Sequence, residues 1–372
     1  MKGSLKIMLL APSLDVGGAE RQLSFLANGL SQRGHDVHVA LFYKQGALLA
    51  DLAKGVCTHD LKKQGRLDLF GFIWRFRRLV QCKRPDIIYS FLGVPNLTSV
   101  FLKMTGIRVP IVWSVRASDV DLSQYGILSR LCYALESKLS KFADHIIVNS
   151  SAGQKYSMAQ GYSGKKMSVI FNGIETDLFK PDKAGAALLR QQWSLQRDDI
   201  LIGIVARLDP MKNHETFLEA AKLVLVENPK IRFACIGDGP QYKQLKALSE
   251  RLGLSENLIW VGARSDMPNI YNALDILCLS SVTEGFPNAL GEAMSCSVPC
   301  ITTDVGDAAY EVGETGIVVP KLNPEAMAMA MLKMIENVRR GKTFATRARV
   351  KKLFSVERMV TETERILQEV LQ

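Results

Sequence analysis

The 372-residue chain has no apolar run near the roughly 18 residues that a membrane-spanning helix needs. Its seven cysteines are an odd number without a C-x-x-C pair, and Cys296 and Cys300 have no histidine or further cysteine nearby. This pattern favours a reduced, cytoplasmic protein over a disulfide-bonded or structural-zinc protein. With 47% hydrophobic and 23% charged residues, the composition is that of a soluble globular protein, and the length suits two domains.

The net charge of +10 is unevenly distributed along the chain. Residues 1–180 contain 24 basic and 13 acidic residues, whereas the remainder contains 23 basic and 24 acidic residues. The N-terminal half should therefore face an anionic partner. The candidates are a membrane surface, a phosphorylated acceptor and nucleic acid.

Buried strands alternate with helices throughout the sequence. The first unit is a strand over residues 6–11, the Gly17-Gly18 turn, a helix over 19–32 and a strand over 37–42. This layout places a phosphate against a helix N-terminus, but the G-x-G-x-x-G fingerprint of dinucleotide-binding proteins is absent. Further strands are predicted over residues 86–91, 111–115, 146–150, 200–205, 233–236, 258–261, 276–279 and 298–302. The pattern predicts α/β domains of the Rossmann-like kind.

Two cations stand at one predicted strand–turn–helix corner. Arg207 and Lys212 flank a proline turn after the strand at 200–205, and Asn213 is expected to cap the helix that starts at His214. Two cations at such a corner favour an anion site. The alternative is a pair of solvated surface cations.

A second corner carries two carboxylates in the sequence EGFPNALGEAM, from Glu284 to Met294. A buried strand precedes it, and Pro287 is expected in the first turn of the helix that follows. The free N–H groups and the helix dipole at such a corner suit a phosphate or a sugar hydroxyl. Glu284 and Glu292 suit paired hydroxyls, because carboxylates only accept hydrogen bonds. The alternative is a turn followed by an ordinary amphipathic helix.

The Glu284-to-Glu292 spacing resembles the Glu-x7-Glu signature of retaining glycosyltransferases of family 4. The sequence GGAER at Gly17–Arg21 resembles that family's first glycine-rich loop, and Asn172-Gly173 resembles its inter-domain crossover. The resemblance covers nearly the whole chain. It implies the GT-B fold, which is two Rossmann-like domains facing a cleft. We expect an acceptor-binding domain over 1–182, a nucleotide-sugar domain over 183–355, and a C-terminal helix over 356–372 that packs back on the first domain.

The resemblance also implies roles for individual residues. Arg207 and Lys212 would stabilise the departing diphosphate, and Glu284 would bind the donor sugar. Many family members have a histidine after the strand at 111–115, but Arg116 occupies that place here, and we assign it with Asp119 to the acceptor side. The remaining implied donor-binding residues are Gly18, Gly237, Arg264, Phe286, Pro287, Asn288, Ala289, Leu290 and Glu292.

The expected reaction is transfer of a hexosyl group from a nucleoside-diphosphate sugar to a hydroxyl, with retention at the anomeric carbon. A UDP-sugar is favoured by family frequency, and a lipid-linked or cell-surface glycan is the expected acceptor by analogy. We expect neither a cofactor nor a metal, because no D-x-D motif stands in a plausible place. The alternatives are a sugar-nucleotide epimerase and a non-catalytic sugar-nucleotide or RNA-binding protein, although we expect no nucleic-acid partner. The sequence leaves the nucleobase, the sugar, the acceptor and the oligomeric state open.

Residues 62–84 combine aromatic and basic side chains. Phe70, Phe72, Trp74 and Phe76 lie among eight lysines and arginines, which suits an interfacial helix on anionic lipid. We therefore expect a cytoplasmic protein bound peripherally to the inner face of the membrane. The alternative is a helix whose apolar face is fully used by the domain core.

Overall fold

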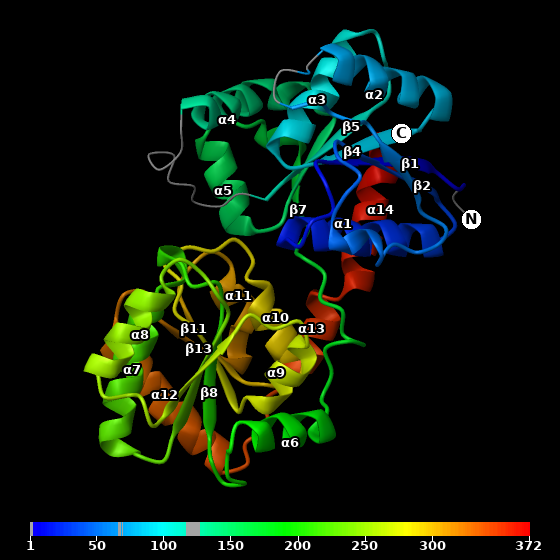
Figure 1. The fold of residues 1–372 in the computed structure, drawn as a ribbon. Helices are drawn as coiled ribbons and strands as arrows, with labels where there is room; N and C mark the ends of the chain where they lie inside the picture. The colour runs from blue at the N-terminus through cyan, green and yellow to red at the C-terminus, as the bar shows by residue number, and fades with distance from the viewer. Residues whose placement is uncertain (1–2, 66–67, 69, 117–126) are drawn as a thin grey trace. The chain divides into compact units, whose positions relative to one another are not determined.

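The computed structural model describes residues 3–65, 68, 70–116 and 127–372. The chain forms two compact units, each built on a parallel β-sheet with helices on both faces (Figure 1). Unit 1 comprises residues 1–173 and 356–372, and unit 2 comprises residues 174–355. The α/β architecture predicted from the alternation of strands and helices is therefore confirmed.

Unit 1 has a seven-stranded sheet in the order β3-β2-β1-β4-β5-β6-β7. Its strands are β1 (Lys6–Ala11), β2 (Asp36–Leu41), β3 (Cys57–Asp60), β4 (Ile87–Phe91), β5 (Ile111–Val115), β6 (His145–Val148) and β7 (Met167–Val169). Its α-helices are α1 (Gly18–Gln32), α2 (Phe70–Lys83), α3 (Gly93–Met104), α4 (Ile127–Leu139), α5 (Ser151–Ala159) and α14 (Val356–Val370). The strands alternate between two apolar cores, because successive side chains point to opposite faces. Ile7 and Leu9 pack with α1 and α14, whereas Met8 and Leu10 pack with α2.

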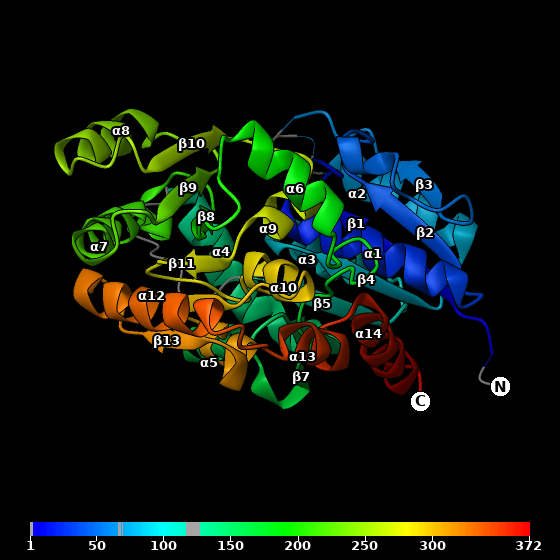
Figure 2. The same cartoon turned by 90° about the horizontal axis from the view of Figure 1, so that it is seen from below.

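Unit 2 has a six-stranded sheet in the order β10-β9-β8-β11-β12-β13. Its strands are β8 (Leu201–Val205), β9 (Arg232–Ile236), β10 (Leu258–Gly262), β11 (Ile276–Leu279), β12 (Cys300–Thr303) and β13 (Ile317–Val319). Its α-helices are α6 (Lys183–Gln192), α7 (His214–Glu227), α8 (Tyr242–Arg251), α9 (Met267–Ala273), α10 (Asn288–Ser295), α11 (Ala308–Val312), α12 (Pro324–Arg339) and α13 (Thr346–Leu353). Figure 2 shows α7 and α12 on one side of these strands and α6, α9 and α10 on the other.

The chain passes from unit 1 to unit 2 earlier than the expected position between residues 182 and 183. Hydrogen bonds explain why the segment 174–182 belongs to unit 2. The Ile174 N–H donates to the Phe354 carbonyl at 2.7 Å, and the Phe179 carbonyl accepts from Ser295 Oγ at 2.5 Å. The Asp182 N–H donates to Asn272 Oδ1 at 2.7 Å. The C-terminal helix α14 is part of unit 1, where Met359, Val360, Ile366 and Leu367 pack in the same core as α1.

The helix α2 divides its aromatic residues between the core and the surface. Phe72 and Phe76 are buried against the sheet, so these two aromatics cannot take part in an outer surface. Phe70 and Trp74 are 93% and 59% exposed. Of the four aromatics in this helix, Phe70 and Trp74 are therefore the two that remain available for an interfacial role.

Candidate functional site

The predicted donor-side residues gather at the carboxyl edge of the unit 2 sheet. The strands β8, β11 and β12 are neighbours there. The segments that follow β8 and β11 carry Arg207–Lys212 and Ser280–Glu284, and Thr303 is the last residue of β12. In open α/β sheets this edge is where ligands bind.

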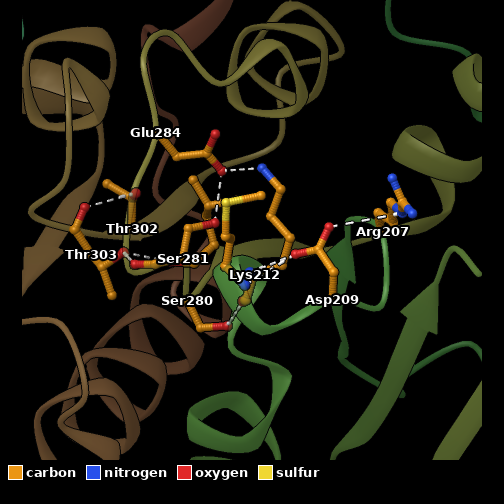
Figure 3. A network of polar contacts seen from close by, with 10 residues as sticks. Arg207, Asp209, Lys212, Ser280, Ser281, Glu284, Thr302 and Thr303 are labelled. Atoms are coloured by element: carbon orange, nitrogen blue, oxygen red, sulfur yellow. Dashed lines mark hydrogen bonds and ion pairs between the residues drawn. The ribbon is translucent and has the colours of Figure 1, made fainter. Parts of the chain in front are cut away.

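The turn that carries Lys212 is held from two sides. Asp209 caps the 3-10 turn η5 (Pro210–Lys212) by accepting from the N–H groups of Met211 at 3.1 Å and Lys212 at 3.3 Å. Ser280, just past the end of β11, donates its hydroxyl to the carbonyls of Lys212 at 3.0 Å and Asn213 at 2.9 Å (Figure 3). The position of Lys212 is thus fixed by groups that the sequence analysis did not select. An aspartate directly before Pro210 is a turn signal that was available.

Asn213 does not cap α7 with its side chain as predicted. It occupies the cap position with a φ of 46°, and its Nδ2 donates to Thr216 Oγ1 at 2.7 Å. The left-handed backbone turns the chain directly from η5 into α7, and asparagine tolerates that conformation better than most residues.

Lys212 and Glu284 form an ion pair (Figure 3). Lys212 Nζ lies 2.5 Å from Glu284 Oε1, and Ser281 Oγ donates to the same oxygen at 2.7 Å. The side chains of Lys212 and Glu284 are 25% and 11% exposed. A phosphate that binds Lys212 therefore has to share this cation with Glu284.

Arg207 stands apart from this pair. Its side chain is 71% exposed, and its Nε lies 3.9 Å from Asp209 Oδ2. The structure thus pairs Lys212 with Glu284, whereas the Arg207 side chain, on the same β8–α7 connection, is mostly exposed (Figure 3).

The turn before α10 differs in one detail from the prediction. Pro287 occupies the N-cap position instead of the first helical turn, and α10 begins at Asn288. The Leu290 N–H donates to the Pro287 carbonyl at 3.0 Å. Because proline has no N–H and the Leu290 N–H is already used, neither supplies an amide to a ligand in this conformation. The Phe286 ring is buried, with its centroid 5.2 Å from that of Phe354, and Ala289 is the second residue of α10.

Glu292 is buried within α10 and is 8% exposed. Tyr271 on α9 donates its hydroxyl to Glu292 Oε2 at 2.7 Å. Nothing in the sequence pointed to Tyr271, because a tyrosine in an amphipathic helix is usually a core residue.

Gly237 and Arg264 have local structural partners. Gly237 has a φ of +138°, and a Cβ added there would lie 2.0 Å from the Ala206 carbonyl oxygen. Glycine therefore lets the loop after β9 approach the end of β8. Arg264 binds Asp266 through two hydrogen bonds of 2.7 Å each, which lowers the pKa of Asp266.

Unit 1 carries the other predicted residues. Gly18 is the first residue of α1, and Arg116 follows β5. Arg116 donates to Asn172 Oδ1 at 2.6 Å and to Ser114 Oγ at 2.9 Å, and its guanidinium lies 5.2 Å from the centre of the Phe91 ring. The assignment of Asp119 to the acceptor side concerns a position outside the described residues.

Two Rossmann-like units in one chain fit the GT-B class of glycosyltransferase folds. Residues 16–178 match the family described as Glycosyltransferase Family 4, and residues 186–351 match the family described as Glycosyl transferases group 1. Together the two matches cover most of both units. The chain belongs to glycosyltransferase family 4, as the Glu-x7-Glu resemblance implied.

Individual relatives support the same assignment. Over 143 residues the chain is 36% identical to the UDP-Gal:α-D-GlcNAc-diphosphoundecaprenol α-1,3-galactosyltransferase of Escherichia coli, a match that spans 38% of this chain and 37% of that protein. It is 21% identical to the N-acetyl-α-D-glucosaminyl L-malate synthase of Bacillus anthracis, over 96% of this chain and 95% of that protein. The crystal structure of Anabaena HepE in complex with UDP has a TM-score of 0.84 at 23% identity, covering 98% of this chain and all of that one. The predicted GT-B fold is therefore confirmed.

The described residues contain no helix that is both long and apolar enough to cross a membrane.

Proposed function

We propose that this chain is a retaining glycosyltransferase that moves a hexosyl group from a nucleoside-diphosphate sugar, with UDP favoured, to a hydroxyl of a lipid-linked or cell-surface glycan. The observation that carries the proposal is the Lys212–Glu284 pair at the carboxyl edge of the unit 2 sheet. Family membership supports a sugar-nucleotide donor. The name of the Escherichia coli relative describes transfer from UDP-Gal to a diphosphoundecaprenol-linked sugar, and HepE has been crystallised with UDP and with UDP-glucose.

The proposed mechanism assigns charge stabilisation to the two cations. Lys212 and Arg207 neutralise the negative charge that develops on the departing diphosphate, so no metal ion is required for that role. Glu284 accepts hydrogen bonds from the donor sugar, and Glu292 accepts them from the ribose hydroxyls. The leaving phosphate takes the proton of the acceptor hydroxyl, and Arg116 in unit 1 holds the acceptor.

Release of nucleotide tests the reaction directly. The protein is incubated with UDP-, GDP- and ADP-sugars and an undecaprenyl-diphosphate-linked sugar, with and without a chelator. We expect nucleotide release with one donor, the same rate with chelator present, and an anomeric coupling constant that reports retention. Lys212→Ala should be inactive. The control Arg340→Ala removes an exposed arginine of unit 2 that forms an ion pair with Glu336, and it should match the wild type.

The same assay excludes the alternatives. An epimerase would convert one sugar nucleotide into another without releasing nucleotide, and a non-catalytic binding protein would bind without turnover. Either result would contradict the proposal, as would an inverted product.

We further propose that α2 contacts an anionic membrane surface. Phe70 and Trp74 are exposed, and the Arg78 guanidinium lies 5.8 Å from the centre of the Trp74 ring. Exposed aromatics next to cations suit a helix at an anionic lipid interface. Arg75 is excluded from this surface, because it donates to the Leu61 carbonyl at 2.8 Å and pairs with Asp68.

Co-sedimentation with vesicles tests the membrane proposal. The double variant Trp74→Ala, Arg78→Glu should lose binding to vesicles rich in phosphatidylglycerol and should keep nucleotide binding. The control Met329→Ala, Arg340→Glu changes an exposed methionine and an exposed arginine in unit 2 and should bind as the wild type does. Wild-type binding should weaken as salt is added. A wild-type protein that ignores these vesicles at low salt would rule the membrane contact out.

A further inference from the structure

Glu311 is a buried carboxyl beside the donor-side loop, and the proposed mechanism does not use it. It lies on α11, and its side chain is 0% exposed. Neither of its carboxyl oxygens has a hydrogen-bond partner among the described residues. The Gly291 N–H faces the carboxyl without the geometry of a full hydrogen bond. A buried carboxyl without partners is costly when charged, so its presence here requires an explanation.

The segment before Glu311 supports the loop that carries Glu284. The Asp307 N–H donates to the Gly285 carbonyl at 3.0 Å. Gly306 has a φ of +54°, and a Cβ added there would lie 2.2 Å from the Glu284 carbonyl oxygen. The backbone of residues 306–307, which leads directly into α11, therefore lies against the loop that carries Glu284.

The carboxyl of Glu311 also fits against the first turns of α10. A Cβ added at Gly291, the fourth residue of α10, would lie 2.8 Å from Glu311 Oε1. Glycine thus leaves the space that the carboxyl occupies. Because the Glu311 carboxyl contacts α10 at Gly291, its charge state can affect the turn that precedes α10.

The charged groups around Glu311 are mostly acidic. Burial raises the pKa of Glu311 well above its usual range, and the carboxylates of Glu284, Glu292 and Asp307 raise it further. The nearby Cys300 thiol is itself buried and uncharged at neutral pH, because burial raises its pKa. The Arg349 guanidinium donates to the backbone carbonyl of Glu311 at 2.9 Å, so it holds the end of α11. Burial and the surrounding carboxylates therefore both favour the protonated, uncharged form of Glu311.

We propose that Glu311 is a positioning residue whose uncharged carboxyl holds the first turns of α10 and the Glu284 loop in the arrangement that accepts the donor diphosphate. This inference rests on the proposed function. Ionised Glu311 would add a negative charge beside Glu284 and Glu292 and against the end of α10 that attracts a phosphate. Donor binding should therefore weaken as Glu311 loses its proton. By linkage, a bound donor should raise the affinity of Glu311 for that proton.

The pH dependence of nucleotide binding tests the proposal. Calorimetry with UDP, GDP and ADP is carried out from pH 7 to pH 9 on the wild type, on Glu311→Gln and on Glu314→Gln. Glu314 is an exposed glutamate three residues away and serves as the matched control. We expect wild-type affinity to fall about tenfold more over this range than that of Glu311→Gln, and Glu314→Gln to follow the wild type. The titration of the nucleotide itself is common to all three proteins and cancels in the comparison.

A purely structural role for Glu311 would lower the free energy of unfolding and leave the pH profile of binding unchanged. If Glu311→Gln is too unstable to measure, Glu311→Leu, which also cannot ionise, should show the same flat profile. Parallel profiles for the wild type and the Glu311 variant would overturn the inference alone. Failure of the wild type to bind any of the three nucleotides at pH 7 would overturn the proposed function and this inference together.

Discussion

Replacing Lys212 with alanine should reduce both activity and stability, and the two effects have separate causes. Loss of a fixed cation next to the departing diphosphate should lower turnover by at least about 100-fold. The loss of stability comes from Glu284, whose side chain is 11% exposed and would keep the hydrogen bond from Ser281 but lose its cationic partner. Breaking a buried pair costs about 3–5 kcal/mol, and a surface pair contributes at most about 1 kcal/mol. Because Lys212 is 25% exposed, we expect a cost between these limits, about 2 kcal/mol.

A double-mutant cycle with Glu284→Gln separates the two effects. The neutral glutamine keeps the shape of Glu284 and removes the unpaired charge. The double variant Lys212→Ala, Glu284→Gln should therefore regain about 1 kcal/mol or more of the lost stability, while turnover stays low. Urea-induced unfolding measures the first quantity and nucleotide release measures the second. The control is Lys333→Ala, which removes an exposed lysine on α12 and should match the wild type in both assays.

Two results would refute this reasoning. Near-normal turnover of Lys212→Ala would remove the lysine from the reaction. Additive stability losses across the cycle would show that the Lys212–Glu284 pair contributes no coupling.

Three further predictions concern single sites. Arg207→Ala should lower turnover by at least about 100-fold in the nucleotide-release assay without changing the free energy of unfolding, because its side chain is 71% exposed; a fully active variant would remove Arg207 from the site. Glu292→Gln should weaken nucleoside-diphosphate binding by about 2 kcal/mol in calorimetry. Tyr271→Phe removes only the hydroxyl that donates to Glu292, so it should weaken binding less. If Glu292→Gln binds the nucleotide as tightly as the wild type does, Glu292 has no role in nucleotide binding. Burial and the charge of Lys212 lower the pKa of His214 in the folded protein to about 4. The unfolded chain therefore binds a proton at this histidine more readily than the folded chain does. The free energy of unfolding should fall by up to about 3 kcal/mol as the pH drops from about 6.5 to 4. Urea unfolding of His214→Leu over the same range should show a smaller loss, and an equal loss would contradict this origin.

Central strands that are buried on both faces were predictable from the sequence, whereas the edge strand β3 and the crossover between the units were not. The predicted bounds of β1 and β5 match the structure to the residue, because continuous apolar runs specify strands buried on both faces. The short strand β3, whose sequence CTHD is half exposed, has no apolar signal and was missed. The crossover was placed late for a related reason. Residues 174–182 have no regular structure, and backbone hydrogen bonds to distant residues attach them to unit 2.

The chemical types at the site were predictable, but their pairing was not. Lys212 and Glu284 each stood at a strand–helix corner, which is a local signal. Their ion pair joins residues 72 positions apart and depends on Ser280 holding the Lys212 turn, which no local pattern reveals. Glu311 gave no signal either, because a glutamate in a short helix is usually solvated.

The position of α14 has a consequence for the order in which the chain folds during synthesis. Unit 2 is a continuous segment, residues 174–355, and is complete when Ser355 leaves the ribosome. Unit 1 is not, since the core next to α1 includes Met359, Val360, Ile366 and Leu367. Val360 lies so close to α1 that a Cβ added at Gly29 would be 2.5 Å from its Cγ2. The part of α1 that packs against α14 therefore stays uncovered until α14 has been synthesised, so the core of unit 1 can be completed only after unit 2 has been translated.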